Sequence, residues 1–153
     1  MLLGHRRLRS ERGGTLVEFG QVAFLLITTM LAMVEFGRML VVYTTVANSA
    51  RAGARYAIVH GNDRTGSGVD GPSGPTACSD PPPAQVATVI RNFASAGMLD
   101  TSKLTIKVCY SPSSNLPGTT VTVKVGYPYD PLIGWFKMLS VNLSSQTAGV
   151  ITY

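Results

Sequence analysis

The sequence predicts an α+β fold, in which one long N-terminal helix packs on a small domain with a second helix and an antiparallel sheet of about three or four strands. Three observations predict it. The run from Val22 to Val34 contains no charge, and apolar residues then recur at steps of three and four as far as Ile58, which is the period of a helix. Two later segments alternate between apolar and polar residues, as half-buried strands do. The chain of 153 residues has room for one small domain beside a membrane segment.

Residues 1–13 are predicted to be a basic leader. The chain has 13 Lys and Arg against 8 Asp and Glu, a net charge of +5, and losing the leader's four arginines and its one acid, Glu11, would leave +2. The basic composition therefore belongs mainly to the leader, and the remaining basic residues are dispersed, so we expect no nucleic-acid partner. Positive charge ahead of an apolar span favours a cytoplasmic N-terminus and an exported C-terminal part.

Residues 14–60 are predicted to form a single helix that is first membrane-embedded and then amphipathic. The stretch from Phe19 to Val34 would be about 24 Å long as a helix, a little short of a hydrocarbon layer of roughly 30 Å. Leu40 to Tyr43 could extend it if Glu35 and Arg38, three residues apart on one helical face, partly neutralise each other. From Phe36 onward, residues at steps of three and four form one apolar stripe, as in an amphipathic helix: Leu40, Tyr43, Ala47, Ala50, Ala54 and Ile58. Gly61 is expected to end the helix.

The rest of the chain divides into a Gly/Pro-rich loop, residues 61–83, and an exported α+β domain, residues 84–153. A helix is predicted from about Pro82 to Ala96 and is expected to end at Gly97. Its predicted buried stripe consists of Val86, Val89, Ile90 and Phe93. Strands are predicted around 104–110, 121–127 and 141–153, with Pro128 and Pro131 breaking the pattern after the second. An apolar patch is expected from Trp135, Phe136, Met138 and Leu139.

The two cysteines favour a Cys78–Cys109 disulfide if the domain is exported to an oxidising compartment, and two free thiols are the alternative. Closing a loop of about 30 residues would stabilise the fold by roughly 3 to 4 kcal/mol. A zinc site is not expected, because His5 and His60 do not complete a spaced ligand set.

The sequence contains no pattern typical of a catalytic site. There is no G-x-S-x-G nucleophile turn, no phosphate-binding glycine loop and no carboxylate cluster outside the membrane segment. We therefore expect a non-enzyme without a cofactor or a metal.

Several spaced elements of the first 60 residues resemble TadE-like proteins, pilin-like components of the tight-adherence (Flp, type IVb) pilus machinery. The family pattern has a basic leader ending in Gly, an acid at the fifth position after it, an aromatic residue, an apolar helix, an E-F-G-R element and an A-R-x-G-A-R-Y-A element. In this chain those elements are Gly13, Gly14 to Val17, Glu18, Phe19, then Glu35, Phe36, Gly37 and Arg38, and then Ser49 to Ala57 with Arg51, Arg55 and Tyr56.

The resemblance implies a pilin-like subunit of the bacterial inner membrane. A prepilin peptidase would cut after Gly13, and the carboxylate of Glu18 would then meet the freed amine of a neighbouring subunit. Cleavage between Gly14 and Thr15 is the alternative, which would put Glu18 at the fourth position. A membrane-border acid without a partner is the alternative role for Glu18, and for Glu35 and Arg38 we expect only an exposed intrahelical pair worth tenths of a kcal/mol.

The function implied by the resemblance is that of a minor pilin or pseudopilin contributing to pilus assembly and surface adhesion. Its partners would be the prepilin peptidase, other pilin-like subunits, the inner-membrane pilus platform and the lipid bilayer. Two alternatives are an unprocessed single-pass scaffold of the same machine and a soluble exported domain released by signal peptidase near Ala52. The second is weakly supported, because the nearest small-x-small site, Ala50 to Ala52, lies far beyond the apolar run.

Overall fold

The computed structural model describes residues 12–61, 78–79, 81–112, 115–134, 137 and 140–152. The elements follow one another as α1 (Arg12–Val59), β1 (Cys78–Ser79), α2 (Ala84–Ala96), the short 3-10 helix η1 (Thr101–Lys103), β2 (Thr105–Ser111), β3 (Thr120–Tyr129) and β4 (Val141–Val150). The strands form one antiparallel sheet in the order β1-β2-β3-β4. The predicted α+β class with a long N-terminal helix is confirmed.

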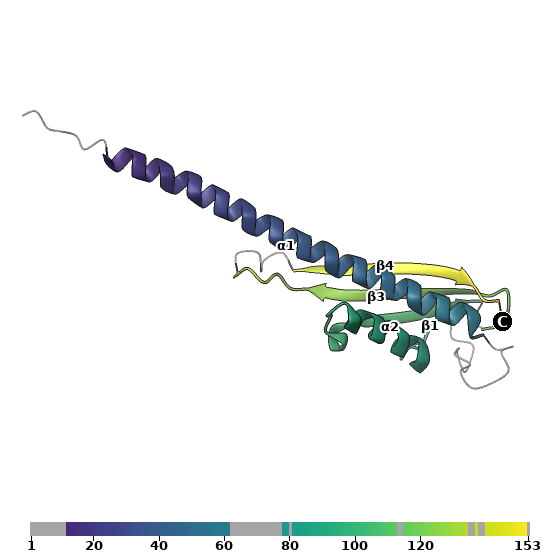
Figure 1. Ribbon diagram of the computed structural model, residues 1–153. Coiled ribbons are helices and arrows are strands. Elements are labelled where there is room, and N and C mark those ends of the chain that lie inside the picture. Colours follow the sequence, from purple (N-terminus) through teal and green to yellow (C-terminus); the bar gives the residue numbers. More distant parts are fainter. Residues whose placement is uncertain are drawn as a thin grey trace, which may run out of the picture.

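The first half of α1 stands clear of the domain. Figure 1 shows it extending beyond the sheet, and no residue from 13 to 34 is buried. We call residues 13–34 the free segment. At about 1.5 Å per residue it is roughly 33 Å long, close to the roughly 30 Å of a bilayer's hydrocarbon core. Helix α1 is long and apolar enough to cross a membrane, and only 11% of its most apolar window is buried, unlike the core helix of a soluble protein.

The second half of α1 belongs to the core of the domain. Its buried face is made of small and β-branched residues, namely Val46, Ser49, Ala50, Gly53, Ala54 and Ala57. A Cβ atom added to Gly53 would lie 2.5 Å from Cγ1 of Ile90, a fully buried residue of α2. Glycine therefore sets how closely the two helices approach here.

Helix α2 buries a stripe that differs from the predicted one at two residues, Val89 and Phe93. Val86 and Ile90 are fully buried as expected, but Val89 is only partly buried and Phe93 is 44% exposed, while Ala87 and Ala94 are buried. The tight approach explains the exposure of Phe93, because at the end of α2 a Cβ on Gly97 would come within 2.3 Å of the Thr45 side chain. An alanine fits that spacing between the helices, whereas a phenylalanine does not.

The sheet has one covered face and one open face. The alternation predicted for β2 and β3 is confirmed, since Ile106, Val108 and Tyr110 are buried and pair across the strands with Val125, Val123 and Val121. Strand β3 also runs through Pro128 to Tyr129, where a break was predicted. Its pairing with β2 stops at Gly126, so Pro128 has only β4 beside it, and a residue without an N–H is tolerated there.

Candidate functional site

The predicted assembly residues all lie on the free segment. Gly13 and Gly14 are in the first turn of α1, with nothing within 4 Å of an added Cβ atom. Glu18 and Phe19 follow on the exposed surface of the same helix. Among the residues that the structure describes, Glu18 has no hydrogen-bond or ion-pair partner. The geometry leaves the carboxylate accessible to another molecule.

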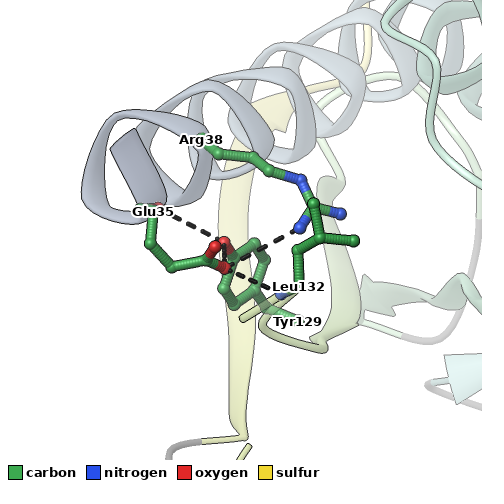
Figure 2. Close-up of polar contacts among 4 residues, drawn as sticks. All are labelled: Glu35, Arg38, Tyr129 and Leu132. Atoms are coloured by element: carbon green, nitrogen blue, oxygen red, sulfur yellow. Dashed lines mark hydrogen bonds and ion pairs between the residues drawn. The ribbon is translucent and has the colours of Figure 1, made fainter. Parts of the chain in front are cut away.

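A second constellation lies where α1 leaves the domain. We call it the junction cluster: Glu35, Arg38, Tyr129 and Leu132. The Tyr129 hydroxyl donates to Oε1 of Glu35 at 2.5 Å and lies 3.3 Å from the Glu35 main-chain oxygen, while the backbone N–H of Leu132 donates to the same Oε1 at 3.1 Å. Figure 2 shows these contacts converging on one carboxylate from the helix, the end of β3 and the residues after it.

The prediction of an exposed Glu35–Arg38 pair is wrong for Glu35. The ion pair itself exists, with Nη1 of Arg38 at 3.7 Å from Oε1, but Glu35 is only 8% exposed. The guanidinium also lies 5.6 Å from the centroid of the Tyr129 ring. Helical spacing predicts contacts within α1 only, whereas two of the hydrogen bonds of Glu35 come from residues more than 90 positions later. In the sequence, the Tyr-Pro-Tyr-Asp-Pro run at residues 127–131 was the one feature that could have indicated a polar contact with α1.

Burial shapes the electrostatics of the junction cluster. Desolvation, followed by the hydrogen bond to Glu35, raises the pKa of Tyr129 from 10.0 to about 12. The phenol therefore remains a hydrogen-bond donor over the whole physiological range. A neutral donor, a backbone N–H and a guanidinium together satisfy the carboxylate at the point where the chain passes from the free segment to the core.

The other residues of the predicted family pattern point in several directions. Phe36 and Gly37 are exposed, and Arg51 and Arg55 lie on the outer face of α1, where Arg51 donates to Oδ1 of Asn48 at 3.3 Å. Tyr56 turns toward α2, and its hydroxyl donates to Oε1 of Gln85. Its ring stacks on His60 at 3.7 Å, and Nδ1 of His60 lies 2.8 Å from the Tyr56 carbonyl oxygen. The sequence pattern thus combines packing contacts with an outward-facing basic surface.

The predicted disulfide is confirmed. Cys78 and Cys109 are bonded and occupy opposite positions in the β1–β2 pairing. Two-residue β1 thereby attaches the end of the 61–83 loop to the sheet edge.

Two open cavities lie beside the junction cluster. The first, about 260 Å³, is lined by Ala32, Glu35, Phe36, Met39, Tyr129, Pro131 and Val141. The second, about 290 Å³, lies on the Arg38 side and also borders Lys103 and Asp130, which form an ion pair at 3.4 Å. Across the described ranges there is no group of three or more His, Cys, Asp or Glu able to hold a metal ion. The predicted patch of Trp135, Phe136, Met138 and Leu139 lies outside the described residues.

Comparison with known proteins gives one finding. The family model described as TadE-like protein matches residues 13–55, which include the free segment, the junction glutamate and the basic face of α1. No curated protein and no solved structure matches the chain. The match confirms the resemblance read from the sequence, and it suggests a membrane protein associated with the tight-adherence pilus.

Proposed function

We propose that this chain is a pilin-like subunit of the tight-adherence pilus machinery, cut after Gly13 and held in the inner membrane by its free segment. The C-terminal domain lies on the outer side of that membrane, where its disulfide is stable. The protein acts by assembly and surface adhesion, with no catalytic step of its own. Its partners are a prepilin peptidase, other pilin-like subunits and the membrane platform of the pilus.

The observation that carries the proposal is an accessible acid on an otherwise apolar, unpacked helix. Glu18 is the fifth residue counted from Gly14, and it lies within the 13–55 match to TadE-like proteins. An unpaired carboxylate in hydrocarbon costs at least about 2.5 kcal/mol, and a free terminal amine at the same depth also needs a partner. Pairing the two between adjacent subunits satisfies both groups and fixes their axial offset.

The local chemistry of the leader end suits cleavage. Gly13 and Gly14 occupy the first turn of α1, and each is about 1 kcal/mol less favourable in a helix than alanine. Glycine also loses more conformational freedom on folding than any other residue, so this turn unwinds more readily than one made of alanines. Neither glycine packs against a described part of the chain.

The test is assembly in cells by Glu18 variants. Glu18→Leu should still insert and lose its leader, yet it should disappear from the sheared pilus or cross-linked assembly fraction and reduce adhesion to a surface. Glu18→Asp should retain part of the assembly, because the charge is kept on a shorter side chain. Glu11→Gln is the matched control, since it changes an acid within the leader and should assemble normally. Wild-type assembly by Glu18→Leu would overturn the proposed pairing.

The unprocessed scaffold remains a second candidate function, because a free segment of bilayer length would anchor the chain whether or not the leader is removed. It predicts that the chain in the membrane still begins upstream of Gly13 and that deleting the peptidase leaves pilus-associated levels of the protein unchanged.

A further inference from the structure

We propose that the end of the domain nearest the free segment is a second membrane-contact surface, which rests on the bilayer interface and takes lipid acyl chains into the apolar cavity beside α1. The surface consists of Phe36, Leu132 and Val141, and we call it the proximal surface. It requires only that α1 is inserted in a membrane, and neither leader cleavage nor subunit assembly enters the argument.

The first step is the apolar character of this end. Leu132 is 75% exposed, Phe36 57% and Val141 44%, and they come from α1, the β3–β4 connection and the first residue of β4. Phe36 and Val141 also line the 260 Å³ cavity. Exposed apolar side chains gathered around an apolar cavity are typical of a surface that is covered in the working protein.

The second step is the absence of free charge in that cavity. Among the described residues of the lining, Glu35 is the one carboxylic acid, and its Oε1 accepts hydrogen bonds from Tyr129 and Leu132 and pairs with Arg38. The carboxylate is therefore satisfied within the protein, as Figure 2 shows. A hydrocarbon chain can occupy the cavity without stripping water from an unpaired charge.

The length of the free segment sets the depth of the proximal surface relative to the membrane. A free segment of about 33 Å crosses the hydrocarbon core and brings Glu35, the next residue, to the interface. The backbone N–H of Leu132 is 3.1 Å from the Glu35 carboxylate, so Leu132 lies at that same level. In Figure 1 this end of the sheet reaches back along α1 toward the free segment. The proximal surface is thus continuous with the membrane span.

The charged groups nearby fit a lipid better than a purely apolar protein partner. Arg38 and Lys103, each about half exposed, border the second cavity on the other side of the junction cluster. Arg38 is paired with Glu35 at 3.7 Å and Lys103 with Asp130 at 3.4 Å, but both cationic side chains are about half exposed. Each can therefore also contact a headgroup phosphate while its methylene stem stays on apolar surface. An apolar cavity next to cations matches the arrangement of acyl chain and headgroup in one lipid.

The test is fluorescence from single-site labels in vesicles of phosphatidylcholine and phosphatidylglycerol. Both native cysteines are held in the disulfide, so an added cysteine can be labelled selectively with an environment-sensitive dye. Leu132→Cys is the test variant, and Leu116→Cys is the matched control, because Leu116 is also exposed but precedes the far end of β3. The full chain is reconstituted at a low protein-to-lipid ratio.

We expect blue-shifted emission at position 132 and several-fold stronger quenching by lipids brominated on their acyl chains than at position 116. Val141→Cys should behave like Leu132→Cys, and it serves as the second variant if a label at 132 disturbs the fold. Equal quenching at 132 and 116 would overturn the proposal. So would quenching and a blue shift at 132 that develop only as the protein density is raised, since a second copy of the chain would then be covering the surface.

Discussion

Replacing Tyr129 by phenylalanine isolates one polar contact that joins α1 to the end of β3. The substitution keeps the buried ring and removes only the hydroxyl that donates to the Glu35 carboxylate. A hydrogen bond to a charged group contributes about 1.5 to 3 kcal/mol, and the carboxylate would keep only the Leu132 N–H and Arg38. For a chain of this size, a loss of about 2 kcal/mol lowers the melting temperature by roughly 4 to 8 °C.

The assay is thermal unfolding of the full chain in detergent micelles, followed by near-ultraviolet circular dichroism. Tyr43→Phe is the control, because Tyr43 is half exposed on α1 and its hydroxyl makes no hydrogen bond within the described residues. The pH dependence adds a signature. The pKa of Tyr129 is raised to about 12 in the fold, so its contribution is complete below pH 10 and is lost as the pH rises from 10 toward 12. Equal melting temperatures for the two variants at neutral pH would refute the reasoning.

Three further changes probe the rest of the fold. Gly53→Ala should lower the free energy of unfolding by about 1 to 3 kcal/mol despite the better helix propensity of alanine, because the added Cβ would lie 2.5 Å from buried Ile90. Chemical denaturation measures this difference, and a stabilised variant would contradict the close approach of the two helices. Cys109→Ser should lower the free energy of unfolding by about 3 to 4 kcal/mol, and the stability of this variant should not change when dithiothreitol is added. If dithiothreitol also leaves the stability of the wild-type protein unchanged, the disulfide does not have this role. Hydrogen bonds from the Ser102 hydroxyl and N–H lower the pKa of Asp100. The wild type should therefore be more stable than Asp100→Asn at neutral pH and should lose this difference in free energy of unfolding as the pH falls below about 4. A stability difference that stays constant down to pH 2 would refute this.

Most of the secondary-structure elements could be predicted from the periodicity of apolar residues. A helix over residues 14–60 was predicted and α1 covers Arg12–Val59, because an apolar run followed by a stripe at steps of three and four has few other solutions. Alternation likewise identified β2 and β3 and the face that each buries. The disulfide could be predicted from the sequence because the chain contains only two cysteines.

The errors occur where contacts between elements decide the outcome. The burial of Glu35 depends on Tyr129 and Leu132, which no local spacing connects with it. The exposure of Phe93 follows from the short distance between α1 and α2, which Gly53 on α1 and Gly97 directly after α2 permit. For the candidate site, the sequence pattern indicated Glu18 from its position after the leader, but the junction cluster required the three-dimensional structure.

The most direct test of the account is the intact mass of the protein extracted from its own cell membrane, compared between cells with and without the prepilin peptidase. Cleavage after Gly13 predicts a mature chain of residues 14–153, beginning with Gly14, in the first case and retention of the basic leader in the second. A chain that keeps residues 1–13 in both strains, or one that begins near Ala52, would contradict the claim that a freed amine provides the partner for Glu18.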